Sequence, residues 1–313
     1  MHVLGIDAGG TKTVCLLADE TGQVLAESRG PGANLHSHGE LAVEKVLHEV
    51  MDAVLGDRAI VPSAICLGIA GVDRDDDLAT MRAIMRRLGP RQARTLIVND
   101  ALVALTAGAG EAAGIVVIAG TGSIAYGCNR QGEAARAGGW GHILGDEGSG
   151  YWIGREALTA VVRAADGRGS ATKLTAEVLA HFAIDSPPRL VHVVYDSELP
   201  RAAVAEIGPI VQRAADAGDA VALRILERAA DELVSLAGSV AGRLEMRGDA
   251  FPFILSGGLF GVVPWLVAEL GRRLIEVAPR SSARLLDREP ARGAVTLALA
   301  EAHGGATVPT YRR

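Results

Sequence analysis

The chain has 313 residues, of which 49% are hydrophobic, 22% are charged and 4% are aromatic, and its formal net charge is −6. This composition excludes an intrinsically disordered chain, and an acidic chain without a Lys/Arg block lacks the electrostatic footprint of a nucleic-acid binder. No apolar run reaches the roughly 18 residues that a membrane span requires. The length favours two domains, each with its own core.

Three short strands are predicted at the start, at 2–6, 13–18 and 23–28, separated by Gly-containing turns. Because the first strand begins at once, without a basic segment or a long apolar one, we expect no signal peptide. Apolar residues with helical spacing follow at 41–54. The remaining elements of this half are predicted in the order strand 64–70, helix 75–88, strand 95–98 and helix 101–109.

The same order restarts near residue 114, with strands at 114–120 and 123–128 and a turn leading towards a third strand. Thr11 and Gly22 are 11 positions apart, as are Thr121 and Gly132. The sequence therefore predicts two copies of one βββαβαβα unit, forming mixed sheets with helices on both faces. The further elements expected in the second copy are helices 149–164, 172–182, 201–217 and 219–246, strand 251–256, helix 261–278, strand 283–287 and helix 293–303.

The segment GIDAGGTKT, residues 5–13, nearly matches a phosphate loop, but Thr11 stands where that motif has Lys and a strand follows instead of a helix. Two interpretations remain open. Backbone N–H groups and the hydroxyls of Thr11 and Thr13 could cradle phosphates, with Asp7 suited to Mg²⁺ through water. Alternatively, the segment is a tight β-turn capped by Asp7.

Three further motifs follow strands. IAGTGSIA, residues 118–125, fits a dinucleotide fingerprint only formally, because a strand follows it, and it is equivalent to the first Gly-rich turn. Asp100 in IVND is interpreted as a helix N-cap or as a base at the carboxyl edge of a sheet. The Gly pair of LSGG, residues 255–258, precedes a helix expected from Gly261 and allows close approach of a neighbour or an adenine ring.

The segment GGWGHILGDEGSG, residues 138–150, contains six glycines, which disfavour a stable helix or strand. The simplest interpretation makes Asp146 the N-cap of a helix near Ser149 and Trp140 a core anchor. The glycines would also allow the backbone to wrap a small polar ligand.

Neither the histidines nor the cysteines predict a metal site. His36 and His38 lack acidic neighbours, so loop residues are favoured over a metal pair. Cys15, Cys66 and Cys128 are far apart in sequence and indicate reduced thiols in a cytoplasmic protein.

In this order and at these distances, the motifs resemble the N-acetylglucosamine kinases of the BadF/BadG-type ATPase family, in the sugar kinase/Hsp70/actin superfamily. The resemblance extends from residue 3 to about residue 303. It implies an α/β fold of two ribonuclease-H-like (actin-like ATPase) domains with a central cleft, 1–112 and 113–290. The helical insertion belongs to the second domain, and helix 291–303 would pack back on the first.

The resemblance implies ATP- and Mg²⁺-dependent transfer of the γ-phosphoryl group to the 6-hydroxyl of N-acetylglucosamine. Asp100 matches the catalytic base and Asp7 the metal-binding position. The matching cofactor-binding residues are Asp7, Gly9, Gly10, Thr11, Lys12, Thr13, Thr121, Ser123, Gly257 and Gly258. The sugar-binding residues are expected to be Asn34, Asp100, Gly139, Trp140, Gly141, His142 and Asp146, while Glu147 has no assigned role.

Two other functions stay open. One is a kinase for glucosamine or a murein-derived amino sugar, because the residues after Asn34 leave the preference for the 2-substituent undecided. The other is an ATP-driven dehydratase activator of the same family, which would need Cys ligands for an iron–sulfur cluster. We expect a small amino sugar as partner, no nucleic acid and no membrane, and a cytoplasmic homodimer.

Overall fold

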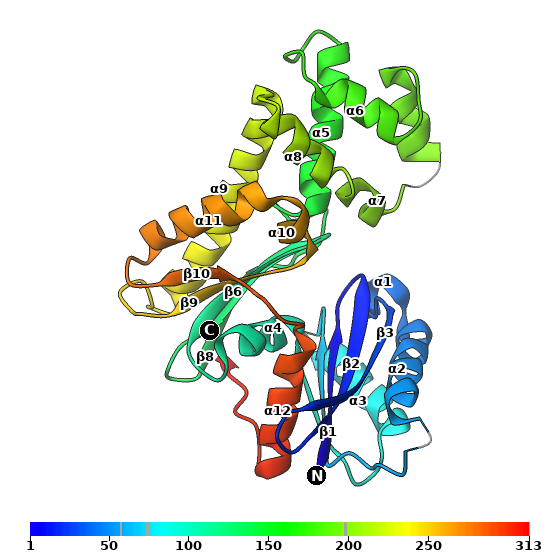
Figure 1. Ribbon diagram of the computed structural model, residues 1–313, viewed down its shortest axis with the longest axis vertical. Helices are drawn as coiled ribbons and strands as arrows, with labels where there is room; N and C mark the ends of the chain where they lie inside the picture. The colour runs from blue at the N-terminus through cyan, green and yellow to red at the C-terminus, as the bar shows by residue number, and fades with distance from the viewer. Residues whose placement is uncertain (57, 73–74, 197–198, 313) are drawn as a thin grey trace. The chain divides into compact units, whose positions relative to one another are not determined.

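The computed structural model describes residues 1–56, 58–72, 75–196 and 199–312, and the chain divides into two compact units (Figure 1). Unit 1 comprises Met1–Val116, Tyr126–Ala135 and Leu286–Arg313, whereas unit 2 comprises Val117–Ala125 and Arg136–Leu285. The domain boundaries expected after residues 112 and 290 stay a prediction.

Unit 1 is built on a five-stranded sheet of order β3-β2-β1-β4-β5. Its strands are β1 (His2–Ala8), β2 (Lys12–Asp19), β3 (Val24–Pro31), β4 (Ala64–Ile69) and β5 (Arg94–Asn99). β1 pairs antiparallel with β2 and parallel with β4, and β4 pairs parallel with β5. The carboxyl ends of β1, β4 and β5 therefore meet at one edge of the sheet.

Helices cover both faces of this sheet. On one face, α2 (Glu40–Leu55) and α3 (Asp75–Leu88) join Leu4 and Ile6 of β1 in a continuous apolar core. The buried residues of α2 recur every three or four positions, as one helical face requires: Val43, Val46, Leu47, Val50, Met51 and Val54. The other face is covered by α4 (Asp100–Ala109) and α12 (Ala291–His303).

α12 lies unusually close to its neighbours because glycines at the contact points carry no side chain. A Cβ on Gly5 would lie 2.4 Å from the backbone nitrogen of Val295, and one on Gly293 would lie 2.0 Å from the carbonyl oxygen of Val103. Figure 1 shows α12, coloured orange to red, beside β1 and α4. The last long helix is thus part of unit 1.

The second sheet has the order β10-β9-β6-β7-β8-β11. Its strands are β6 (Gly114–Ala119), β7 (Ser123–Cys128), β8 (Glu133–Gly138), β9 (Pro252–Ser256), β10 (Ser282–Leu285) and β11 (Thr310–Tyr311). Read from β8 to β10, it repeats the order of the first sheet, which confirms the duplicated α/β fold. The unpredicted β11 adds a sixth strand by pairing parallel with β8.

Between β8 and β9, the residues that the structure describes from Gly150 to Arg243 are mostly helical. The helices of unit 2 are α5 (Gly150–Ala165), α6 (Leu174–His181), α7 (Arg201–Ala205), α8 (Gly208–Asp216), α9 (Ala220–Arg243), α10 (Gly258–Val262) and α11 (Pro264–Val277). Shorter turns are α1 (Leu35–His38), which was expected to be a loop, η1 (Pro187–Arg189) and η2 (His192–Asp196). Within the described ranges, no helix is long and apolar enough to cross a membrane.

Two expected helices are each interrupted near a proline. The helix predicted at 201–217 ends at Ala205 and restarts as α8, with Pro209 in its first turn. The helix predicted at 261–278 begins earlier, at Gly258, and breaks at Val263. Pro264 starts α11, and a proline sterically disfavours helical geometry for the residue before it, here Val263.

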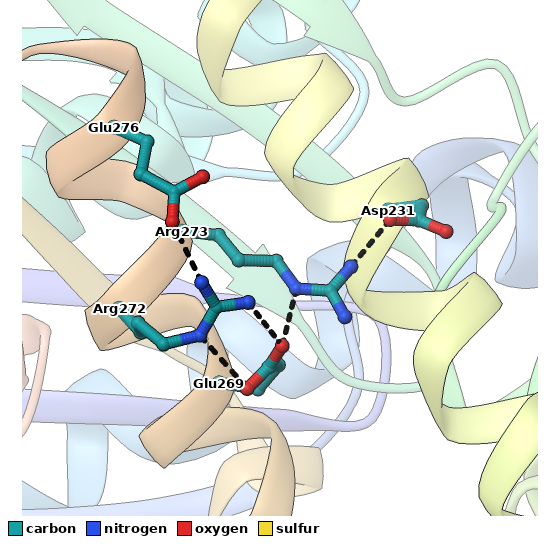
Figure 2. Close-up of polar contacts among 5 residues, drawn as sticks. All are labelled: Asp231, Glu269, Arg272, Arg273 and Glu276. Carbon is teal, nitrogen blue, oxygen red and sulfur yellow. Dashed lines mark hydrogen bonds and ion pairs between the residues drawn. The ribbon is translucent and has the colours of Figure 1, made fainter.

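α9 and α11 pack together and are joined by an ion-pair network (Figure 2). Arg273 bonds to Asp231 of α9 and, through Nε at 2.5 Å, to Glu269 of its own helix. Arg272 bonds to Glu269 and Glu276. Arg273 is the more buried of the two arginines, with 18% of its side chain exposed, so its bonds contribute more to stability than those of Arg272.

Asp219 caps α9, accepting hydrogen bonds from the N–H groups of Val221 and Ala222, and it also accepts one from the N–H of Lys173. Burial alone would raise its pKa, but these bonds lower the pKa on balance from the usual 3.8. An ionised cap with a depressed pKa stabilises the fold above pH 3.8, and this contribution is lost as the pH falls through the folded-state pKa.

We predict that Asp219→Ala lowers the free energy of unfolding by about 0.5–2 kcal/mol at pH 7, the usual cost of losing an N-cap. The difference from the wild type should shrink below about pH 3.8. Urea unfolding at several pH values measures both effects, with exposed Asp249→Ala as the matched control. A difference independent of pH would contradict the assignment of an ionised cap.

Candidate functional site

Two carboxylates lie near the edge where the parallel strands of unit 1 end. Asp7 is the penultimate residue of β1 and is 8% exposed, whereas Asp100 follows β5 as the first residue of α4. Burial, and then the negative charge of Asp100, raise the pKa of Asp7 to about 8, against the opposing charge of Lys12. A carboxylate whose negative charge is disfavoured in this way is suited to bind a cation.

Asp100 is not the helix cap that its position suggested. The cap of α4 is Asn99, whose side-chain oxygen accepts a hydrogen bond from the N–H of Ala101 at 2.8 Å. The capping interpretation was wrong by one residue, because Asn and Asp are equally good caps and stand side by side here.

The first Gly-rich turn is held by backbone hydrogen bonds. The N–H of Gly9 donates to the carbonyl oxygen of Lys12 at 3.0 Å, and the carbonyl oxygen of Gly9 accepts from the N–H of Ala33 at 3.1 Å. Gly10 and Thr11 are exposed. The hydroxyl of Thr13 is buried and donates to the carbonyl oxygen of Pro31 at 2.8 Å, so its hydrogen is engaged within the fold.

Lys12 belongs to an ion cluster that the sequence analysis missed. Its Nζ lies 3.0 Å from a carboxylate oxygen of Glu289, and Arg29 contacts the other oxygen at 2.9 Å. Glu289 stands two residues before α12, so the cluster joins the first Gly-rich turn to that helix. No local motif marks residues separated by 277 positions.

Asn34 lies near the same sheet edge. Its side-chain nitrogen donates to the carbonyl oxygen of Ala70 at 3.4 Å, and the N–H of Ala70 donates to the carbonyl oxygen of Ala8. His38 contacts the carbonyl oxygen of Asn34 through Nδ1 at 3.2 Å. The side chain of His36 is outside the described part of the chain.

In unit 2, the second Gly-rich turn follows β6 as the first follows β1. Gly120 donates from its N–H to the carbonyl oxygen of Gly122 at 2.9 Å and accepts from the N–H of Gly150 at 2.8 Å. Thr121 is half-buried and Ser123 is buried. The turn is therefore anchored to the first residue of α5.

Ser123 connects this turn to the Gly-rich segment 138–150, which we call the sugar loop after its predicted ligand. Its N–H donates to Asp146 at 3.2 Å, and its hydroxyl donates to the carbonyl oxygen of Glu147 at 2.7 Å. Glu147, which had no role assigned from sequence, thus contributes through its main chain. Two parts of the predicted site are brought together by one buried serine.

Asp146 holds the sugar loop in an unusual backbone conformation, with φ of 62°. Left-handed geometry of this kind is tolerated best by Gly, Asn and Asp. The sequence suggested that Asp146 caps α5, but this interpretation was wrong. The N-cap is Ser149, whose side-chain oxygen accepts a hydrogen bond from the N–H of Trp152. The hydroxyl directly before the helix is the nearer acceptor, which leaves Asp146 to bond with Ser123.

Trp140 is 60% exposed, so its interpretation as a core anchor was wrong. The glycines beside it, Gly139 and Gly141, have φ of 72° and 79°, and this backbone turns the indole outwards. The guanidinium of Arg136 lies 5.0 Å from the centre of the ring. Trp140 is therefore an exposed platform beside His142.

Gly257 brings the end of β9 against the end of β6. Its φ is 115°, and a Cβ there would lie 2.2 Å from the carbonyl oxygen of Ala119. Gly258, by contrast, has no atom within 4 Å of where its Cβ would be. Unit 2 thus places Gly257 beside the strand that leads into the second Gly-rich turn.

Among the residues that the structure describes, no three His, Cys, Asp or Glu side chains gather into a group that could hold a metal ion. Mg²⁺ in phosphoryl-transfer sites typically uses one or two carboxylates, substrate phosphates and water. Asp7, which is buried, and Asp100, which is half-buried, fit that donor set.

Two sheets of one strand order, each with a Gly-rich turn after its central strand, define the actin-like ATPase class of fold. The chain belongs to the BadF/BadG/BcrA/BcrD ATPase family, which its residues 4–298 match.

The similarity to two named kinases covers nearly the whole chain. It is 37% identical to the N-acetylmuramic acid/N-acetylglucosamine kinase of Clostridium acetobutylicum, covering 96% of this chain and 99% of that one. It is 35% identical to the N-acetyl-D-glucosamine kinase of Dictyostelium discoideum, covering 95% and 97%. The crystal structure of a proposed N-acetylglucosamine kinase from Chromobacterium violaceum superposes with a TM-score of 0.78 at 28% identity, covering 95% and 98%.

Substitutions at Gly257 and Gly258, the two glycines after β9, allow a structural effect to be distinguished from an effect on ligand binding. We predict that Gly257→Ala lowers the melting temperature, because its Cβ would overlap the carbonyl of Ala119 at a backbone angle that alanine disfavours. Gly258→Ala should leave the melting temperature unchanged but raise KM for ATP, if adenosine packs against this backbone. Thermal unfolding and kinetics measure the two effects, and the reverse pattern would contradict the assignment.

Proposed function

We propose that this protein is an ATP-dependent kinase that phosphorylates the 6-hydroxyl of N-acetylglucosamine. The observation that carries the proposal is the bonding of Ser123, directly after the second Gly-rich turn, to Asp146 and Glu147 of the sugar loop. A sugar kinase needs its phosphate-binding and sugar-binding segments in a fixed relation, and here one residue provides it. The names of the Clostridium and Dictyostelium relatives support the same activity.

Asp100 is proposed as the base that accepts the proton of the sugar 6-hydroxyl. Phosphoryl transfer has a loose transition state, so catalysis consists mainly of positioning and charge neutralisation. A carboxylate after β5, at the carboxyl edge of the sheet, is suited to hold the attacking oxygen. Backbone N–H groups of the Gly-rich turns and the charge of Lys12 would bind phosphate oxygens.

Asp7 is proposed to hold Mg²⁺, which would supply positive charge to the phosphate oxygens when bound. Burial and the charge of Asp100 raise the pKa of Asp7, so a cation would relieve an existing electrostatic cost.

Asp146 and His142, with the backbone of Gly139–Gly141, are proposed to bind the sugar. Asp146 would accept hydrogen bonds from ring hydroxyls, which disfavours epimers that leave those groups unpaired. Asn34 is proposed as a further sugar-binding residue. A homodimer and a cytoplasmic location remain expectations.

The second candidate substrate is N-acetylmuramic acid, favoured by the name of the Clostridium relative. The dehydratase-activator alternative is disfavoured because Cys15 and Cys66 are fully buried within strands of the sheet. Burial raises the pKa of the Cys15 thiol to about 12, which opposes the thiolate that a cluster ligand requires.

A panel of sugars in a coupled ADP-release assay tests the proposal. We expect the highest kcat/KM for N-acetylglucosamine among N-acetylglucosamine, N-acetylmuramic acid, glucosamine, N-acetylmannosamine and glucose. A preference for N-acetylmuramic acid would establish the second candidate. Turnover of none of these sugars would refute an amino-sugar kinase.

Asp100→Asn should lower kcat by about 10²–10⁴-fold, the usual contribution of a general base, while ATP still binds. Asn keeps the size and one oxygen acceptor but cannot accept the proton. Steady-state kinetics together with nucleotide titration measure the two effects. Near-normal sugar phosphorylation by this variant would show that another group is the base.

Asp146→Asn should raise KM for the sugar by at least about tenfold, as expected for losing a hydrogen bond to a charged group, and leave KM for ATP nearly unchanged. Asn tolerates the φ of 62° and keeps an acceptor for Ser123, so the loop should stay folded. Circular dichroism and thermal unfolding provide the control. A larger effect on KM for ATP would contradict this division of roles.

A further inference from the structure

Arg201, which the sequence analysis did not select, reaches the sugar loop. It is the first residue of α7, in the helical insertion, and its Nη1 lies 3.4 Å from Nδ1 of His142. The His142 ring also packs against Tyr151 in a T-shaped arrangement, with 5.3 Å between ring centres and an interplanar angle of 83°. The imidazole is therefore held from two directions.

Glycines of α5 set the position of α7. A Cβ on Gly154 would lie 2.0 Å from the carbonyl oxygen of Val204, and one on Gly150 would lie 3.1 Å from the Cβ of Ala205. The backbones of the two helices can approach closely only because these positions lack side chains. Since α5 begins where the sugar loop ends, this packing fixes Arg201 beside the loop.

The contact with Arg201 selects one form of the imidazole. A guanidinium has five N–H donors and no acceptor, so Nδ1 of His142 must be the acceptor in this bond. The ring is then neutral and carries its hydrogen on Nε2. His142 is thereby defined as a hydrogen-bond donor through Nε2, the polarity needed to bind a hydroxyl or carbonyl oxygen of a sugar.

Arg201 also acts on Asp146 through its charge. Burial raises the pKa of the Asp146 carboxyl, while the N–H of Ser123 and the positive charge of Arg201 oppose that rise. The guanidinium thus favours the ionised carboxylate, which accepts hydrogen bonds through both oxygens.

We propose that Arg201 is a positioning residue of the sugar site, fixing His142 as an Nε2–H donor and placing a positive charge beside Asp146. The role of these two residues in binding sugar rests on the proposed function, whereas the state of the imidazole does not. The helical insertion therefore takes part in substrate recognition.

Nitrogen-15 NMR of the imidazoles tests the proposal without any substrate. In the wild type, His142 should show the Nε2–H tautomer, and its signal is assigned by its loss in His142→Gln. Arg201→Met removes the donor and the charge but keeps much of the length, and it should yield a mixture of tautomers. An unchanged His142 signal in Arg201→Met would overturn the proposal.

Kinetics test the consequence for the sugar. Arg201→Met should raise KM for N-acetylglucosamine about tenfold or more, with KM for ATP changing less than about twofold, and Arg201→Lys should restore part of the loss. Arg189→Met, an exposed position in the same insertion, is the matched control and should behave as the wild type.

A double-mutant cycle separates positioning from a general effect on the fold. If Arg201 acts through His142, Arg201→Met combined with His142→Ala should be less harmful than the product of the single effects on kcat/KM for the sugar. Multiplicative effects, or equal increases in both KM values, would overturn the proposal. If the wild type turned over no sugar, the proposed function would fail, while NMR would still decide the role of Arg201.

Discussion

A few glycines, which have no side chain, allow helices and strands in both units to approach one another closely. Gly5 and Gly293 let α12 lie against β1 and α4, Gly154 lets α7 lie against α5, and Gly257 lets β9 approach β6. At each point a Cβ would lie 2.0–2.4 Å from a backbone atom of the neighbour. Backbone atoms cannot move aside as a flexible side chain can, so these contacts fix where the candidate site residues lie.

Within unit 2, several candidate site residues are held by two groups of hydrogen bonds. Ser123 bonds to Asp146 and Glu147, and Arg201 bonds to His142. The left-handed backbone conformation of Asp146 also turns the loop at this residue. The Asp146 carboxylate is thus both a structural acceptor and the proposed sugar ligand.

The sequence predicted the duplicated fold because apolar periodicity and Gly-rich turns are local signals. The prediction from sequence was wrong where two neighbouring residues are equally suited to one role, as with Asn99 and Asp100 at the N-cap of α4. It was also wrong where a proline ends one helix and starts the next, as at Pro264. Contacts such as Lys12 with Glu289 and Arg201 with His142 join distant segments, and no spacing rule in one sequence can indicate them. The motifs located candidate residues, but only the structure supplied their neighbours.

The contribution of α12 to unit 1 also constrains how the chain folds during synthesis. Residues 286–313 belong to the unit that begins at Met1, so the covering of one face of its sheet is incomplete until the last part of the chain leaves the ribosome. Strands β1 to β5 emerge long before the helix that covers them. Unit 1 is therefore incomplete until α12 has emerged, and its uncovered sheet face is exposed to aggregation or chaperone binding in the interval.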